Sequence, residues 1–176
     1  GCNQGVEEFK QLIDEISIEE KLHFKTAFIR SEISKDLLLQ KWEQGKITPL
    51  DHTPPLTSEG IRNLHRSVAM MGPEPFIKAL EADADVIISG RSTDASVFAS
   101  YPIYKGISPN TAWHAAKIIE CGAATAVPKS HDCIMATIRD NEFLIQTLNP
   151  NKTLPWKNVA AHTMYENASP FHLKEP

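Results

Sequence analysis

The stretch DVIISGRSTDAS at residues 85–96 joins a short apolar run to a glycine and a polar turn. Val86, Ile87 and Ile88 are β-branched and bounded by polar residues, which is typical of a buried strand. Gly90 permits a tight turn after this strand, and a helix is predicted to follow Asp94. Because ligands of open α/β sheets bind beyond the carboxyl ends of the strands, this turn is where a site is expected.

Helical and extended patterns alternate around this stretch. Helices are predicted over residues 6–20, 34–45, 57–71, 75–82, 108–126 and 158–167, and a strand over residues 23–30. Residues 132–139 and 142–148 are predicted to form a hairpin around Asp140-Asn141. This order predicts an α/β fold, a mostly parallel sheet flanked by helices with an appended antiparallel hairpin near residues 132–148. We expect residues 1–176 to be a single α/β domain and a fragment of a longer protein, because neither end carries a terminating feature.

The composition narrows the class of protein. A formal net charge of -4 without a basic run argues against a nucleic-acid surface. Cys2, Cys121 and Cys133 are widely spaced, which indicates reduced thiols and a cytoplasmic location. No apolar run approaches the roughly 20 residues that a membrane span needs, so no membrane partner is expected.

The turn at residues 90–94 is the first candidate site. Gly90, Arg91, Ser92 and Thr93 are predicted to bind a ligand, and the free N–H groups of the following helix favour an anion there. Arg91 adds a forked, permanently charged donor that suits a carboxylate or a phosphate. Asp94 is predicted to act as an acid or base, or to orient Arg91. The alternative is a surface arginine followed by an aspartate that caps the helix.

The second candidate site lies on the helix predicted over residues 108–126. His114, Lys117 and Cys121 have the spacing of one helical face, and Lys117 and Glu120 have the spacing of an ion pair. His114 is a candidate acid or base, and Lys117, Glu120 and Cys121 are candidate ligand-binding residues. The alternative is a helix that packs closely through its small residues, with Cys121 as a small apolar side chain.

The third candidate site is the pair His162 and Glu166, which lie four residues apart on one predicted helical face. This spacing can bind a metal or position a base, and we include both residues among the catalytic candidates. The alternative is a helix that docks through Val159 and Met164. No metal site is predicted, because no further ligand has the spacing of a zinc site.

Several segments taken together resemble the acyclic terpene utilisation (AtuA-type) family. They are residues 69–76 (AMMGPEPF), residues 85–88 with Gly90, Arg91 and Asp94, residues 117–118 with residues 120–122, and residues 159–163 with residues 165–166 before Ser169-Pro170. The similarity covers nearly the whole chain, and it identifies the middle portion of the family domain. Members of the family extend further at both ends and have a glycine-rich loop near the position of Gly1, where this chain has GCNQG.

The resemblance implies a role in the catabolism of citronellol-type terpenes through branched acyl-CoA thioesters. We therefore expect an enzyme or enzyme subunit that acts on a small-molecule carboxylate or an acyl-CoA by lyase- or hydratase-type acid–base chemistry. Arg91 would hold the anionic group, and Asp94, His114 or His162 would transfer the proton. The acyl-CoA enters as a substrate, and no cofactor is identified.

Two other functions stay open at this point. The first is a non-catalytic partner or scaffold of an acyl-CoA-metabolising complex. The second is a Rossmann-like nucleotide-binding module, although the chain has no GxGxxG loop followed by an acidic residue about 20 positions later. The protein contacts that we expect are a homo-oligomer or other segments of the same protein.

Overall fold

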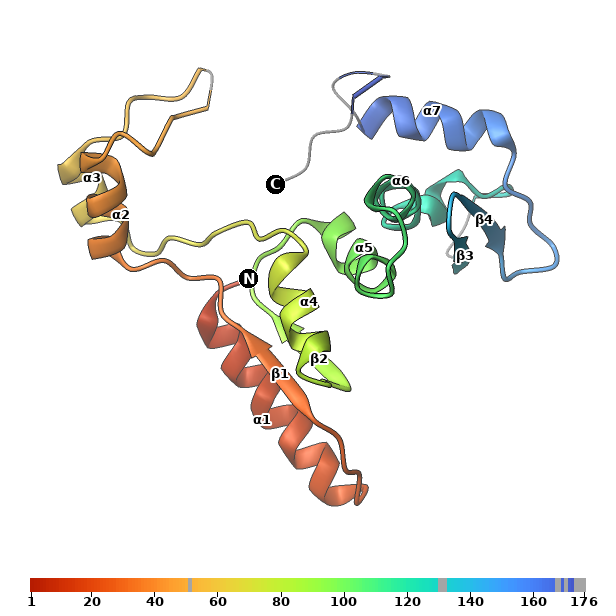
Figure 1. Ribbon diagram of the computed structural model, residues 1–176, viewed down its shortest axis with the longest axis horizontal. Helices are drawn as coiled ribbons and strands as arrows, with labels where there is room; N and C mark the ends of the chain where they lie inside the picture. Colours follow the sequence, from red (N-terminus) through yellow and green to blue (C-terminus); the bar gives the residue numbers. More distant parts are fainter. Residues whose placement is uncertain (51, 130–132, 167–168, 170, 173–176) are drawn as a thin grey trace. The chain divides into compact units, whose positions relative to one another are not determined.

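The structure is a computed structural model that describes residues 1–50, 52–129, 133–166, 169 and 171–172 (Figure 1). It divides into two compact units. The first comprises Gly1–His23, Phe28–Met70 and Ile88–Arg91, and the second comprises Phe24–Ala27, Met71–Ile87 and Ser92–Pro176. Each unit is considered by itself below.

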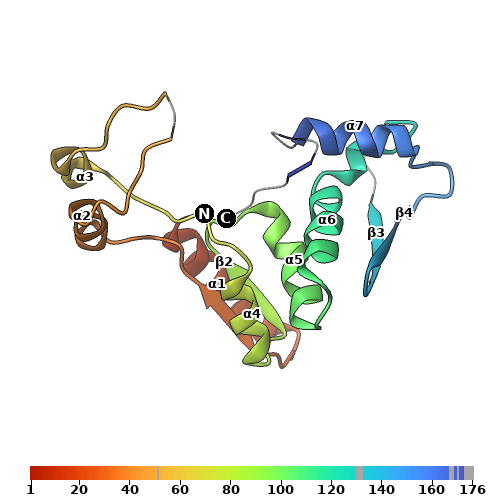
Figure 2. The same cartoon turned by 45° about the horizontal axis from the view of Figure 1, so that its top comes forward.

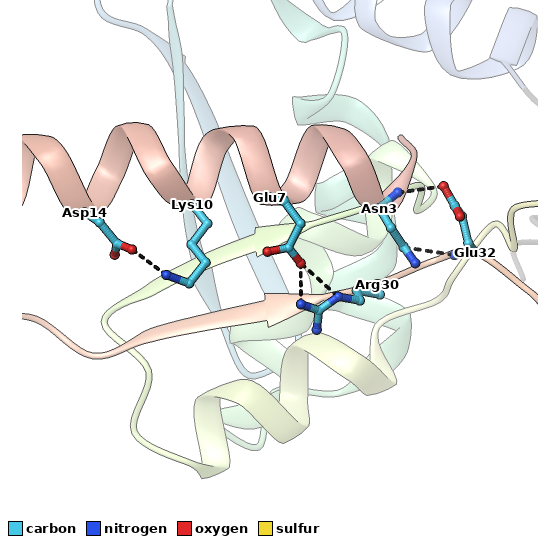
Figure 3. A network of polar contacts seen from close by, with 6 residues as sticks. All are labelled: Asn3, Glu7, Lys10, Asp14, Arg30 and Glu32. Carbon is cyan, nitrogen blue, oxygen red and sulfur yellow. Dashed lines mark hydrogen bonds and ion pairs between the residues drawn. The ribbon is translucent and has the colours of Figure 1, made fainter.

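In the first unit, the helix α1 (Asn3–Glu19) contacts Phe28 of the strand β1 (Thr26–Ile29) and Arg30, which follows that strand. The Glu7 carboxylate accepts a hydrogen bond of 3.0 Å from the Arg30 Nε, as Figure 3 shows. The Lys10 ammonium lies 5.6 Å from the centroid of the Phe28 ring. Val6 of α1 is buried, so the helix packs through this residue, and its charged side chains make the contacts with Phe28 and Arg30.

The strand β2 (Val86–Ser89) pairs with β1 in a short two-stranded parallel sheet. Gly90 continues the pairing, because its N–H donates to the Ile29 carbonyl at 2.8 Å. Every residue of both strands is only half-buried. Mixed helix and strand are confirmed, but in the part of the chain that the structure describes the parallel sheet has two strands, so the fold is α/β only in a loose sense.

The helices α2 (Lys35–Glu43) and α3 (Ser58–Asn63) begin where their capping residues predict. The Ser34 hydroxyl accepts from the Leu37 N–H at 3.3 Å, and the Thr57 hydroxyl accepts from the Gly60 N–H at 3.0 Å. The prediction that α3 continues to residue 71 was wrong. The chain beyond α3 is extended, because the Ala69 N–H donates to the Ser31 carbonyl at 2.7 Å.

The second unit is built around two helices, α5 (Asp94–Tyr104) and α6 (Pro109–Ile119), which lie side by side in Figures 1 and 2. Its buried centre consists of alanines from both helices, Ala95, Ala99 and Ala116, with Ile103 and Trp113 packed against them. Small side chains on both helices allow this close approach. The helix α4 (Glu74–Glu81), predicted over residues 75–82, contacts α5 and has Pro75 in its first turn.

The predicted hairpin is confirmed as β3 (Ile134–Arg139) and β4 (Glu142–Thr147), which pack against α6. Arg139 pairs with Glu142, so Asp140 and Asn141 form the turn. Asp132, where the predicted first strand begins, lies outside the described residues. The final helix, α7 (Trp156–Glu166), contacts α6 as well.

The prediction of one helix over residues 108–126 was wrong at its carboxyl end. α6 ends at Ile119, and the 3-10 helix η1 (Gly122–Thr125) follows after a break. Gly122 lies against Ile134 of β3, where an added Cβ would come within 2.1 Å of the Ile134 Cδ1. The turn therefore brings the chain closer to the hairpin than a continuing helix with a larger residue would allow. None of the described helices has the length and apolar character that a membrane crossing requires.

Candidate functional site

The first half of the 90–94 turn has a tightly held backbone. The Arg91 N–H donates to the Ser31 hydroxyl at 2.8 Å and to the Gly1 carbonyl at 3.2 Å. The same Ser31 hydroxyl donates to the Gly1 carbonyl at 2.7 Å. Only glycine fits at position 90, because an added Cβ would lie 2.2 Å from the Ser31 Oγ. These contacts fix the backbone from which the Arg91 side chain leaves.

The Arg91 side chain itself is exposed. Among the residues that the structure describes, its guanidinium makes no ion pair or hydrogen bond. Other arginines of the same unit are engaged, since Arg30 pairs with Glu7 and Arg66 pairs with Glu32 at 3.1 Å. A planar guanidinium group that extends from a fixed backbone, with its N–H donors unbonded to described residues, is suited to bind a carboxylate or a phosphate.

The second half of the turn starts α5. The Thr93 N–H donates to the Met71 carbonyl at 3.0 Å, and Ser92 forms a parallel bridge with Met71. Thr93 occupies the N-cap position, but its hydroxyl makes no capping bond. The Thr93 Oγ1 is buried and has no hydrogen-bond partner among the described residues. A buried hydroxyl in this state retains the capacity to bond a group placed at the start of the helix.

Asp94 is the first residue of α5, and its side chain is exposed. The alternative that Asp94 caps the helix was wrong, because Thr93 stands at the capping position. A carboxylate in the first turn is still favoured by the helix dipole. Asp94 forms no hydrogen bond or ion pair with any described residue, so the structure does not join it to Arg91 or to a histidine.

The predicted ion pair on α6 is confirmed. The Lys117 Nζ lies 2.6 Å from the Glu120 Oε1, and the two side chains retain only 13% and 7% of their exposure. Buried charges require such pairing, since each would be costly alone. The pair is well placed to stabilise the end of α6, and a ligand-binding role for Lys117 and Glu120 stays a prediction.

The other two residues of the second candidate site, His114 and Cys121, are exposed and form no part of this ion pair. The His114 ring is exposed and lies edge-on to the Phe143 ring of β4, with 5.0 Å between centroids. Cys121 lies beyond the end of α6 with φ -125° and ψ 8°, and it is exposed. The predicted common helical face therefore holds for His114 and Lys117, which lie three positions apart on α6, and was wrong for Cys121, because the helix ends before position 121.

His162 and Glu166 both belong to α7, as predicted. The His162 side chain is half-buried, and it has an interaction partner. The side chain of Glu166 lies outside what the structure describes. Whether this pair acts as an acid or base stays a prediction. Within the described ranges, no three His, Cys, Asp or Glu side chains gather in a group that suits a metal ion.

Sequence reasoning singled out neither Ser31, which lies beside the turn, nor Cys2 as a site residue. Ser31 is 2% exposed and anchors both Arg91 and Gly1. The sequence feature that could have identified Ser31 is its position just after β1. The carboxyl ends of neighbouring parallel strands meet at one edge of the sheet, so Ser31 lies near the turn that follows β2. Cys2 precedes α1, and the pKa of its thiol lies below the ordinary value, chiefly because the backbone N–H of Gly5 interacts with the sulfur.

Comparison with known proteins identifies one family. A model of the family described as "Acyclic terpene utilisation family protein AtuA" matches residues 3–133 of the 176. The match includes the 90–94 turn and all of α6. No curated protein and no solved structure matches the chain.

Proposed function

The chain belongs to the acyclic terpene utilisation family AtuA, and on that premise we propose that it is an enzyme or enzyme subunit that binds a branched organic acid or an acyl-CoA thioester through Arg91. The family's connection with acyclic terpenes directs the proposal to branched carbon skeletons. Arg91 binds the anionic group of the substrate, which is either a free carboxylate or a phosphate of coenzyme A.

The observation that carries this proposal is the state of Arg91. Its backbone N–H is held by the Ser31 hydroxyl and the Gly1 carbonyl, whereas its guanidinium is exposed and has no partner among the described residues. A fixed backbone lowers the entropy that is lost when the side chain binds an anion. The buried Thr93 hydroxyl, which lacks a bond within the described part of the chain, supports a ligand oxygen at the start of α5.

For the reaction, we propose acid–base chemistry of the lyase or hydratase type with Asp94 as the proton-transferring group. Asp94 is exposed beside the proposed anion site in sequence, and no described residue pairs with its carboxylate. His114 and His162 are the alternative proton-transferring groups. His114 is also exposed, whereas His162 is half-buried.

The test is substrate binding by Arg91→Lys, measured by calorimetry with branched carboxylates and branched acyl-CoA thioesters. Lysine keeps the charge but loses the fork, so we expect binding to weaken by about one to two decades. Arg62→Lys is the matched control, because Arg62 is an exposed arginine of the same unit, on α3. Equal affinity of Arg91→Lys and wild-type protein for every ligand that binds would refute the role of Arg91.

The alternative function is a non-catalytic subunit or scaffold of an acyl-CoA-metabolising complex. It is favoured by the exposed apolar side chains of α7, where Trp156, Met164 and Tyr165 are 75%, 63% and 85% exposed. Large apolar surfaces of this kind often bind other proteins. Substrate turnover distinguishes the two functions, because a scaffold binds its partner normally after Arg91→Lys and turns over no substrate in any variant.

A further inference from the structure

We infer that the exposed apolar face of α1 binds an amphipathic helix of a partner protein whose own apolar face is flanked by lysines or arginines. The face consists of Phe9, Leu12 and Ile16, which are 61%, 52% and 50% exposed, and we call it the α1 stripe. The inference is independent of Arg91 and of any catalysed reaction. It concerns the first unit alone.

The α1 stripe has the geometry of a helix-packing seam. Its residues are separated by three and then four positions, which places them on one face of the helix. This alternation is the a and d pattern of a two-helix interface, in which each side chain inserts between four residues of the opposing helix. The stripe is continuous over about two turns of α1.

The charged contacts of α1 lie on a different side of the helix. Glu7 bonds Arg30, and Lys10 bonds Asp14, as the dashed lines in Figure 3 show. With about 100° of rotation per residue, Glu7 lies about 160° away from Phe9 around the helix. The charged contacts of α1 are therefore made by the side away from the apolar stripe, and the buried Val6 lies between the two, about 60° from Phe9 on the side away from Leu12.

The electrostatic border of the stripe specifies the partner. Glu8 and Glu15 directly precede Phe9 and Ile16, at the g positions of the same pattern, and both are exposed. Glu15 makes no ion pair with any described residue, and Glu8 accepts only the uncharged Gln4 amide at 2.9 Å. A partner helix with Lys or Arg opposite these positions would satisfy both carboxylates and associate faster.

A second copy of α1 does not fit this surface. In a parallel pair, a g residue faces the e residue five positions later in the partner, so Glu8 would face the apolar Ile13 and Glu15 would face the like-charged Glu20. In an antiparallel pair, glutamates at g would face each other and repel. The charges thus favour a heterotypic, basic partner over self-association of α1.

The experiment uses the full chain and two synthetic helical peptides of about three heptads, both with leucine at a and d. One peptide carries lysine at e and g, and the other carries glutamate. Fluorescence anisotropy measures their binding at low and at high salt. We expect the basic peptide to bind about tenfold or more tightly than the acidic one, with a preference that weakens in high salt.

Matched variants distinguish specific binding at the α1 stripe from non-specific hydrophobic binding. Leu12→Ser should weaken binding of the basic peptide by about tenfold, because an interfacial leucine is lost. Ile18→Ser is the control, since Ile18 is 77% exposed on the same helix but lies about 180° from Phe9. Glu15→Lys should reduce or reverse the preference for the basic peptide. Circular dichroism confirms that each variant folds.

Three outcomes would overturn the inference. The first is equal affinity for the two peptides, or no binding of the basic one. The second is an equal effect of Leu12→Ser and Ile18→Ser. The third is self-association of the full chain in sedimentation that Leu12→Ser abolishes, because a second copy would then occupy the α1 stripe.

Discussion

Replacing Gly90 by alanine tests the packing that holds the 90–94 turn. The added Cβ would lie 2.2 Å from the Ser31 Oγ, 2.8 Å from the Ser31 Cβ and 3.0 Å from the Ser31 backbone nitrogen. Rotating the hydroxyl relieves only the first of these contacts, and it breaks the bonds to Arg91 and Gly1. The backbone must therefore move, because Ser31 is nearly fully buried.

The magnitude follows from these two losses. Overpacking of a well-packed position costs about 1–3 kcal/mol. Each of the two Ser31 hydrogen bonds contributes about 0.5–1.5 kcal/mol to the free energy of unfolding. We therefore expect Gly90→Ala to lower the free energy of unfolding by about 2–6 kcal/mol.

Urea unfolding of the full chain measures this loss, and Gly5→Ala is the control. Gly5 lies inside α1, and nothing lies within 4 Å of the position of its added Cβ. Alanine there should stabilise the protein by about 0.5–1 kcal/mol. Adding Ser31→Gly to Gly90→Ala removes the two closest atoms, so the double variant should be less destabilised than the sum of the single variants. An unchanged midpoint for Gly90→Ala would show that the close approach of Gly90 to Ser31 does not exist.

Three further predictions concern other parts of the chain. Asp94→Asn should abolish any turnover while the unfolding free energy falls by no more than about 1 kcal/mol, the size of a helix-dipole contribution; unchanged turnover would remove Asp94 from the reaction. Glu120→Gln should destabilise the protein by about 1.5–3 kcal/mol, because it removes the charged hydrogen bond between Lys117 and Glu120, and Glu120→Gln combined with Lys117→Met should recover part of this loss in the same urea assay. Since its lowered pKa means more thiolate at neutral pH, Cys2 should be alkylated by iodoacetamide faster than an unperturbed thiol, with the rate falling as the pH drops through that lowered pKa; a pH profile equal to that of free cysteine would contradict this.

Local sequence signals predicted where α2 and α3 begin, and they failed where α3 and α6 end. Ser34 and Thr57 start their helices through short-range hydrogen bonds that the sequence itself encodes. The end of α3 depends instead on a distant segment, because the chain near Ala69 bonds to Ser31 after β1. α6 likewise stops before position 126, and the following Gly122 packs on Ile134. Such tertiary contacts outweigh helix propensity, which contributes only tenths of a kcal/mol per residue.

The candidate site shows the same division between local and distant information. The strand, the glycine and the start of α5 around Arg91 follow from the residues 85–96 alone. Ser31 can bond the Arg91 N–H only because β1 pairs with β2. The hydrophobic pattern within a single segment does not show which strands pair. The common face predicted for His114 and Cys121 assumed an unbroken helix and was lost with it.

The alanine-rich contact between α5 and α6 has a consequence for how this sequence tolerates change. Ala95, Ala99 and Ala116 are fully buried, whereas Val97 and Phe98 on α5 are 48% and 42% exposed. A saturation library along α5 should therefore recover a strict pattern, with glycine, alanine and serine alone surviving at the inner positions and many residue types at the outer ones. Among homologous chains, the inner positions should be substituted slowly and the outer positions quickly. The substitution rates along α5 would then identify the face of the helix that packs against α6.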